Sequence, residues 1–213
     1  MPEVLEGILQ SIRDYPFFYI IILAVAVLCI LLWSKAMRAA RRRRGEKEAL
    51  IAELEHEKAL RTQFRQVTQQ QLIDIPPTRL VEGLCCSVQM WLEKQEDMQA
   101  AYDALPEPRR LVYALGYVIQ DGREELSEFF RKNGPPLTYA ALEAAWRLVG
   151  GEYAQLFQRE YDAFDKSNEK VSLAKGDIAA ADARFHALAQ ERGEELYAEA
   201  KEYILANSDK FTI

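Results

Sequence analysis

From residue 78 to the end of the chain, apolar residues recur every three or four positions in successive groups. Prolines, glycines and small polar residues separate these groups, as they separate helices in globular domains. No convincing alternation of apolar and polar residues occurs there, and no Asn-Gly or Asp-Gly turn lies between β-branched stretches. The pattern predicts an all-α domain of six or seven helices over residues 78–213. The marker positions are Leu80, Leu84, Val88, Trp91, Leu92, Leu111, Leu115, Val118, Ile119, Leu126, Phe129, Phe130, Leu142, Ala145, Leu148, Val149, Leu156, Phe157, Tyr161, Phe164, Ile178, Phe185, Leu188, Leu196, Ala200, Tyr203 and Ile204.

Local signals predict where several of these helices begin and end. Thr78 and Thr138 precede apolar groups and are expected to act as N-caps. The Gly-Gly pair at 150–151 is expected to close the helix before it, and Asn207 to terminate the last helix. Phe211 then lies beyond that end, and we expect it to fold back onto the domain.

A different pattern occupies residues 15–34, which form an uncharged run of twenty residues. A helix of this length spans about 30 Å, the thickness of a hydrocarbon core. Tyr15, Tyr19 and Trp33 lie near its ends, where amphipathic aromatic residues favour the headgroup level. A cleaved signal peptide is disfavoured because the preceding segment is more acidic than basic, and a buried core helix would be shorter. The sequence predicts a retained single-pass transmembrane helix.

Basic residues follow the predicted span in a dense group, whereas only Arg13 precedes it. By the positive-inside rule, the N-terminus lies outside and the long C-terminal part lies in the cytoplasm of a cell-membrane protein. Residues 1–14 are expected to form a short extracytoplasmic amphipathic helix that either lies on the outer surface or extends the span. Anionic lipid headgroups would attract the basic side chains and hold this end of the anchor. These topology residues are Lys35, Arg38, Arg41, Arg42, Arg43, Arg44 and Lys47.

Residues 35–74 contain many strong helix formers and predict a basic juxtamembrane segment that continues as a helical stalk. Leu60, Phe64 and Val67 fit a heptad step, which would make a homo-oligomer through a coiled coil possible. Continuing that register backwards places Glu57 in the apolar seam, which disfavours the coiled coil. A solvated spacer is the preferred interpretation.

Charge is distributed unevenly between the two parts of the chain. Residues 1–47 carry a balance of +4, and residues 48–213 carry a balance of −10. Nucleic-acid binding requires clustered cations, so an acidic domain is not expected to bind nucleic acid. The basic run therefore indicates membrane topology and not a nucleic-acid site.

Few residues suggest chemistry. The chain has no phosphate-binding glycine loop, no nucleophile elbow and no Cys-x-x-Cys pair, so no cofactor, metal site or enzymatic activity is expected. Glu124, Glu125 and Glu128 place carboxylates on one helical face, as acid–base or metal chemistry requires, but a charged surface is the preferred interpretation. Cys85 and Cys86 fit buried apolar positions better than a redox or lipidation site.

The segments RRLVYALGYVIQDGREELSEFFRKNG, ALEAAWRLVGGEY and EYILANSDKF, with an Asp-x-x-Phe pair between them, resemble a small bacterial family. It is the helical domain of unknown function that includes a DNA-mimic protein, and the resemblance covers roughly residues 100–213. The family's Asn-Gly-Gly core is reduced here to Asp121-Gly122 followed by Arg123. The resemblance implies an interaction domain that presents acidic faces to DNA-binding proteins. The matching positions are Gly122, Leu126, Phe129, Phe130, Asn133, Gly150, Asp182, Phe185, Tyr203, Ile204, Asn207 and Phe211.

Taken together, these patterns predict a membrane-tethered cytoplasmic interaction module that binds a protein partner without catalysis. A regulator, a scaffold and an immunity-type inhibitor all fit this description. The alternative is a structural envelope protein that self-associates through its stalk. An enzyme with a site assembled from acidic residues distant in sequence is a third hypothesis.

Overall fold

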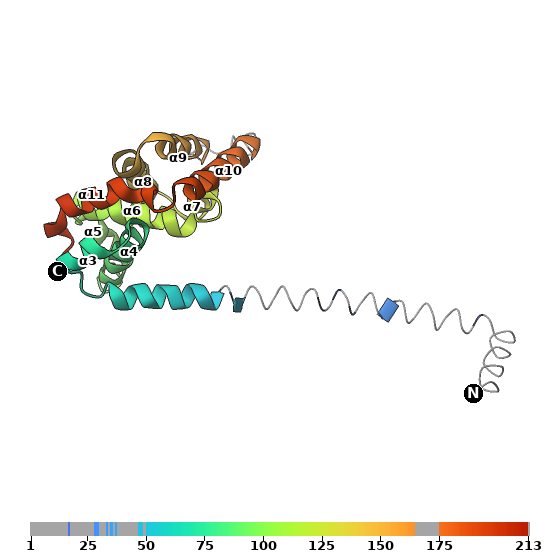
Figure 1. Ribbon diagram of the computed structural model, residues 1–213, viewed down its shortest axis with the longest axis horizontal. Coiled ribbons are helices and arrows are strands. Elements are labelled where there is room, and N and C mark those ends of the chain that lie inside the picture. The colour runs from blue at the N-terminus through green and yellow to red at the C-terminus, as the bar shows by residue number, and fades with distance from the viewer. Residues whose placement is uncertain are drawn as a thin grey trace, which may run out of the picture. The chain divides into compact units, whose positions relative to one another are not determined.

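The computed structural model describes residues 50–164 and 175–212, together with single positions nearer the N-terminus. The chain divides into two units, Met1–Glu55 and His56–Ile213. Every regular element in the described residues is a helix and none is a strand, which confirms the all-α prediction (Figure 1).

The predicted membrane span over residues 15–34 lies outside the described residues except at single positions, of which Trp33 is one. Among the residues that the structure does describe, no helix combines the length and the apolar character that crossing a bilayer requires. Lys35 and Lys47 are described and helical. The remaining anchor and topology residues lie outside the described part: Tyr15, Tyr19, Arg38, Arg41, Arg42, Arg43 and Arg44.

The compact unit begins with a helix whose residues 56–63 belong to it, and α3 (Gln69–Asp74) follows. Thr68 caps α3 through a capping box, because its hydroxyl accepts from the Gln71 N–H while the Gln71 side chain accepts from the Thr68 N–H. Lys201 donates to the carbonyls of Ile73 and Ile75 and so ties the end of α3 to the C-terminal part of the domain.

This opening segment is part of the core, where the sequence led us to expect an exposed stalk up to residue 74. Leu60, Phe64 and Val67, whose heptad-like spacing suggested a coiled coil, are all buried inside the unit. Their apolar face is therefore explained by packing within one chain. The domain accordingly begins at His56, earlier than the predicted start at residue 78.

Helices α4 (Pro77–Leu92) and α6 (Glu107–Asp121) form the most extensive helix pair of the described residues. Two glycines allow the close approach of the surrounding elements. A Cβ on Gly116 of α6 would lie 2.3 Å from the Cβ of Cys85 on α4, and a Cβ on Gly83 would lie 2.1 Å from the Phe64 ring. Only hydrogen fits at these contacts, because larger groups would push the helices apart.

The two predicted threonine caps are wrong. Helix α4 begins at Pro77 with Pro76 in the cap position, and α8 (Leu137–Ala144) begins after Pro136, so both threonines lie inside their helices. Proline favours the first helical turn because its fixed φ suits the helix and its missing N–H leaves no unpaired donor. Pro77 takes this first position in α4, whereas Pro136 is the cap residue before α8.

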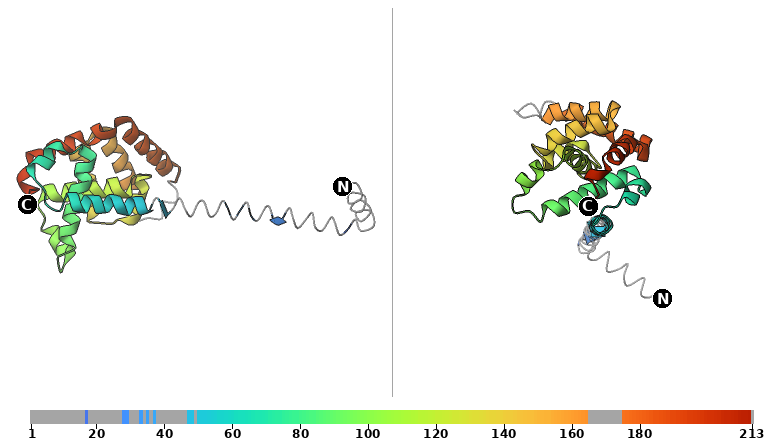
Figure 2. Two further views of the ribbon diagram at one scale, coloured as in Figure 1. Left: turned by 60° about the horizontal axis from the view of Figure 1, so that its bottom comes forward. Right: turned by 90° about the vertical axis from the view of Figure 1, so that its left-hand side faces the viewer.

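Helix α5 (Met98–Asp103) lies in a stretch that the periodicity left unassigned. Asp97 caps it by accepting from the Ala100 N–H at 2.9 Å. In Figure 2, the segment between α4 and α6 that contains α5 projects from the rest of the compact unit. A second apolar cluster around Tyr102, Leu105 and Tyr113 holds this projection.

The remaining elements build the other side of the unit, where α10 packs against α9 and α7. Gly150 and Gly151 adopt φ values of +68° and +53° and turn the chain before α9, as predicted for this pair. Phe211 is buried against the core, which confirms that the C-terminus folds back. The elements are α7 (Leu126–Lys132), η1 (Ala145–Val149), α9 (Gly151–Phe164), α10 (Lys175–Arg192), η3 (Gly193–Tyr197), α11 (Ala198–Ala206) and η4 (Ser208–Lys210).

Candidate functional site

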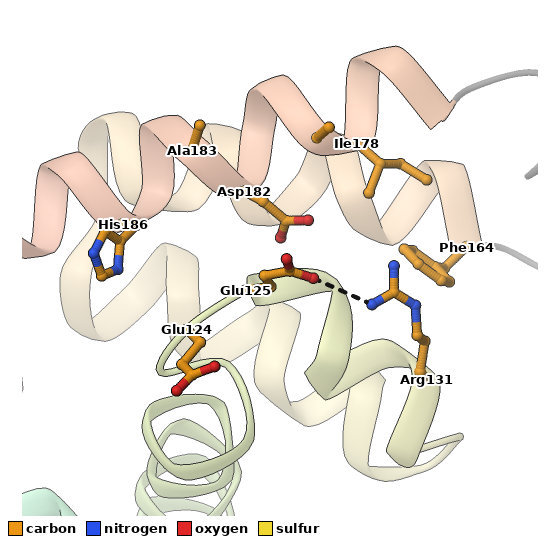
Figure 3. Close-up of a pocket in the computed structure, with 9 residues that line it drawn as sticks. Glu124, Glu125, Arg131, Phe164, Ile178, Asp182, Ala183 and His186 are labelled. Carbon is orange, nitrogen blue, oxygen red and sulfur yellow. Dashed lines mark ion pairs between the residues drawn. The ribbon is translucent and has the colours of Figure 1, made fainter. Parts of the chain in front are cut away.

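An open cavity of about 470 Å³ lies between α10, the start of α7 and the end of α9 (Figure 3). Charged and apolar side chains both line it, and Arg131 lies beside Phe164. We call it the acidic cavity. Its lining residues are Glu124, Glu125, Arg131, Phe164, Ile178, Ala179, Asp182, Ala183 and His186.

Negative groups outnumber positive groups in the acidic cavity. Asp182 and Glu125 point toward each other from α10 and the N-cap of α7 (Figure 3). Arg131 is already engaged, because its Nη1 lies 3.5 Å from Glu125 and 2.5 Å from Glu128. Within the described part of the chain, Glu124 makes no ion pair. The cavity therefore retains an excess of negative charge.

Asp182 is a buried carboxylate that joins α10 to α7. Its Oδ1 accepts from the Ser127 N–H, and its Oδ2 accepts from the Ser127 hydroxyl, both at 2.8 Å. Since Ser127 lies in the first turn of α7, Asp182 satisfies one of the amide donors that the helix itself leaves unpaired. These two bonds fix the carboxylate at the edge of the cavity.

Glu160 on α9 is a buried acidic residue that the sequence did not single out. Its side chain is only 1% exposed, and within the described part of the chain its carboxyl oxygens have no partner other than the Asp182 carboxylate, which acts on Glu160 through a side-chain hydrogen bond. Burial raises the pKa of Glu160 to about 9, and the negative charge of Asp182 adds to the effect. Glu160 is therefore protonated near neutral pH. The three charged residues that act on its pKa are Asp182, Arg131 and Glu125, and all of them line the acidic cavity.

A buried carboxyl group with a raised pKa beside an ionised one is an arrangement that enzymes use for acid–base catalysis. Here the oxygens of Glu160 are fully enclosed, so a substrate in the cavity would meet Asp182 and not Glu160. Among the described residues, no group of three or more His, Cys, Asp and Glu side chains is arranged to hold a metal ion. The cavity therefore exposes carboxylate groups and apolar surface together.

A second feature lies on the neighbouring surface of α8, η1 and α9. Tyr139 is 54% exposed and Trp146 is 47% exposed, seven residues apart on one face of a continuous helical segment. The Tyr139 ring lies 6.0 Å from the ring of Tyr161, and Trp146 Nε1 donates to Gln158 Oε1 at 3.3 Å. We call Tyr139, Trp146 and Tyr161 the aromatic strip.

Ring contacts connect the aromatic strip to the acidic cavity. Tyr161 lies 6.4 Å from Phe130, and Phe130 stacks on Phe164 with ring centroids 5.5 Å apart. Phe164 lines the cavity, and the Arg131 guanidinium lies 5.9 Å from its ring centroid. A continuous series of ring contacts therefore runs from the exposed aromatic strip to the lining of the acidic cavity.

The sequence positions that resemble the bacterial family lie in the core and at helix ends. Phe129 and Phe130 contact Phe157, and Phe185 contacts Tyr153. Leu126, Ile204 and Phe211 are buried, whereas Tyr203 is half-buried beside Arg147.

The polar and glycine positions of that set shape the chain between helices. Asn133 donates to Asp121 at 2.8 Å and to the Phe129 carbonyl at 2.9 Å, and Asn207 donates to the Tyr203 carbonyl at 2.9 Å. A Cβ on Gly122 would lie 2.7 Å from the Val118 carbonyl oxygen. Asp182 is the single member of the set that also reaches the acidic cavity.

Sequence reasoning identifies some of the cavity residues and misses others. Glu124 and Glu125 stand out in the sequence as neighbouring carboxylates, and the structure brings them to the cavity, whereas Glu128 lies outside its lining. Glu160 is missed because a single glutamate in a helix of mixed polarity gives no local signal. Cys85 and Cys86 are both buried, and burial raises the pKa of each thiol, which makes them less reactive.

Comparisons of the chain with protein-family models, with curated proteins and with solved structures found no match. The resemblance to the DNA-mimic-like family stays a prediction. The acidic cavity and the aromatic strip are the features of the structure that bear on function.

Proposed function

We propose that the protein is a membrane-tethered cytoplasmic module that binds a protein partner through the surface of α8, η1, α9 and α10, without catalysis. The observation that carries the proposal is the exposure of Tyr139 and Trp146 on one helical face. Tyrosine and tryptophan are enriched where protein interfaces gain most of their binding energy. Two such rings beside an acidic cavity form a surface with both apolar area and charge.

The tether in this proposal is supported by sequence. Residues 15–34 carry no charge over a length that matches a bilayer, and seven basic residues follow within thirteen positions. The positive-inside rule then places the compact unit in the cytoplasm. Lipid headgroups are the expected partner of the basic residues.

The resemblance to the DNA-mimic-like family supports one class of partner. A DNA-binding protein has a basic surface, which would complement the negative charge of residues 48–213. In this case the partner would meet the module at the membrane. Nucleic acid itself is not an expected ligand, since like charges repel.

A second candidate is a structural envelope protein that self-associates through the segment before the compact unit. Leu50, Ile51 and Leu54 are helical and more than half exposed, which favours this alternative for that segment. Crosslinking and mass measurement of the full chain in detergent would test it. A monomer under these conditions would count against the alternative.

The test of the main proposal is affinity capture with the full chain, expressed in its own cells and extracted with mild detergent. Captured proteins from wild type are compared with those from a Tyr139→Ser/Trp146→Ser variant. Trp91→Ser is the matched control, because Trp91 is also exposed but lies on α4. We expect one protein to be enriched by wild type and by the control, and lost with the double variant.

Two outcomes would overturn the proposal. One is that wild type enriches nothing beyond what a truncated chain of residues 1–55 captures. The other is that the same protein is captured equally well by the double variant, which would place the contact elsewhere.

A further inference from the structure

We infer that a narrow groove between α4, the start of α6 and the C-terminal residues binds a carboxylate group carried on a short aliphatic chain. We call it the Arg109 groove. The site goes beyond the proposed function, because none of its residues belongs to the aromatic strip or to the acidic cavity. Besides Arg109, the lining residues are Leu84, Ser87, Val88, Trp91, Leu105 and Phe211.

Arg109 is a half-buried cation without an acidic partner in the described residues. Its Nε donates to the Lys210 carbonyl, and within residues 50–164 and 175–212 no ion pair or further hydrogen bond involves its Nη1 and Nη2 groups. Glu107, two positions earlier in the chain, pairs with Arg147 at 2.5 Å. Asp209 pairs with Lys210 at 2.6 Å. Burial lowers the pKa of Arg109, and a bound anion would compensate this cost.

The hydrogen-bond donors of the groove suit a carboxylate. The two terminal nitrogens of a guanidinium match the two oxygens of a carboxylate and form two parallel hydrogen bonds with them. The Ser87 hydroxyl and the Trp91 Nε1–H also line the groove, and neither donates a hydrogen bond to any described residue. Residues 48–213 carry a balance of −10, so acids are in excess and the missing partner of Arg109 is a property of the groove itself.

The size and the apolar walls of the groove select the kind of anion. The enclosed space is about 10 Å³, which admits a group the size of one water molecule. A single carboxylate oxygen has this size, whereas a phosphate or sulfate group is larger. The aliphatic part of the ligand then lies outward along the Trp91 ring, which is 37% exposed. The buried walls are apolar and consist of Leu84, Val88, Leu105 and Phe211.

The carboxylate could come from two sources. A free short-chain carboxylic acid is the first, and the C-terminal end of a polypeptide with an apolar last residue is the second. Trp91 is also the control position in the capture experiment, and a free acid as the ligand is consistent with the partner being retained by Trp91→Ser.

The experiment uses the full chain in nanodiscs of phosphatidylcholine, with isotope-labelled leucine and valine methyl groups and indole nitrogens observed by NMR. The probe is sodium isovalerate, and isovaleramide is the matched neutral probe. Sodium chloride at the same concentration is the control for a simple anion. We expect saturable shifts with isovalerate alone, at the methyl groups of Leu84, Val88 and Leu105 and at the indole N–H of Trp91. This comparison on wild type does not depend on the folding of any variant.

Variants assign the binding to Arg109. We expect Arg109→Gln to weaken isovalerate binding roughly tenfold, because it removes the charge and the paired donors. Arg109→Lys keeps the charge but not the planar fork, and we expect a loss of about threefold. Arg110→Gln is the matched control, because Arg110 is the neighbouring half-buried arginine of α6 and lies outside the groove lining. We expect it to bind isovalerate as wild type does.

Three results would overturn carboxylate binding. Equal shifts with isovaleramide would show an apolar contact only, and equal shifts with chloride would show an adventitious ion only. An unchanged affinity in Arg109→Gln would place the anion elsewhere.

A second probe, Nα-acetyl-leucine, carries its carboxylate as the end of a polypeptide does. Tighter binding of this probe than of isovalerate would support carboxylate binding and assign the ligand to a polypeptide C-terminus. The reverse order would support a free acid. A failed capture experiment overturns the proposed function and leaves carboxylate binding in the Arg109 groove unaffected.

Discussion

The compact unit contains two buried glutamates, Glu82 and Glu160, whose carboxyl groups have different neighbours. Glu82 on α4 is 5% exposed, and Glu160 on α9 is 1% exposed. Glu82 accepts from Arg123 at 2.8 Å and lies 3.6 Å from His56 Nε2. Glu160 has no basic partner at hydrogen-bond distance in the described residues, and the charged neighbour that acts on it most strongly is another acid, Asp182.

The difference separates a structural carboxylate from a candidate functional one. Glu82 ties the first helix of the unit and the turn after α6 to α4, and its partners compensate the cost of burial. Burial and the charge of Asp182 raise the pKa of Glu160 to about 9, and Asp182 lines the open acidic cavity. Strongly perturbed groups at a cavity are characteristic of functional sites. Replacing the two glutamates by glutamine should therefore change the stability with opposite signs.

The largest effect is expected on the Glu82 side, where packing holds the structure. Phe64 is fully buried, and its ring lies against Gly83, the neighbour of Glu82. Phe64→Ala should destabilise the compact unit by roughly 3–5 kcal/mol, because it leaves a cavity in the core. Urea unfolding of the full chain, followed by circular dichroism, measures the change. An effect under about 1 kcal/mol would show that residues 56–75 do not belong to the core, contrary to the structure.

The next largest effect is expected at the link between α10 and α7. Asp182→Ala should cost roughly 2–3 kcal/mol, since the Ser127 N–H and hydroxyl would both lose their acceptor in a buried place. Asp182→Asn is the matched variant. Its amide oxygen still accepts one of the two bonds, so it should retain about half of the lost stability. Equal losses in both variants would mean that the charge of Asp182, and not its hydrogen bonds, holds α7.

The opposite sign is expected at Glu160. Its folded-state pKa of about 9 lies above the value of about 4.3 in the unfolded chain. The folded state is therefore most favoured below about pH 4.3, and this contribution is lost as the pH rises toward 9. Glu160→Gln removes the ionisation and should stabilise the protein at pH 7 by roughly 1–3 kcal/mol.

The measurement is urea unfolding of wild type and Glu160→Gln at several values between pH 5 and pH 9, a range set by the pKa of about 9. The two stabilities should converge at the acidic end and separate as the pH rises. A constant difference over the whole range would mean that Glu160 is paired in solution and that the structural comparison with Glu82 fails.

Much of this fold could be predicted from periodicity alone. Apolar spacing marked the long helices α4, α6 and α9, because each buries one stripe of a regular helix. The spacing did not reveal α5, whose six residues hold one buried ring. It also suggested a stalk where Leu60 and Phe64 enter the core, since a single sequence does not show which chain covers an apolar face.

The candidate site depended on contacts that sequence spacing does not encode. Glu160 and Asp182 come from different helices, and their meeting follows from the packing of α9 against α10. Asp182 was named through its resemblance to a family position, but its role in capping α7 needed the hydrogen bonds to Ser127. Local acidic residues such as Glu124 gave a signal because they are adjacent in sequence. Long-range pairs of single residues gave none.

The smallest effect is expected when the same Glu→Gln substitution is made at Glu82, the buried glutamate that has basic partners. Glu82→Gln keeps the size of the side chain and one acceptor for Arg123, but it removes the negative charge. Arg123 is 61% exposed, so water can solvate it once the charge of Glu82 is gone. The variant should therefore lose only about 1 kcal/mol, less than the cost of stranding a buried charge.

The opposite signs of the two Glu→Gln substitutions are the decisive result, measured in the same urea series at pH 7. A loss at Glu82 and a gain at Glu160 would show that the fold compensates one buried carboxyl group and tolerates the other. A gain at both positions would mean that burial alone sets the cost and that Arg123 and His56 contribute no net stabilisation. Glu160 would then not distinguish the acidic cavity from other parts of the protein, because Glu82 would also be a buried glutamate that lowers stability.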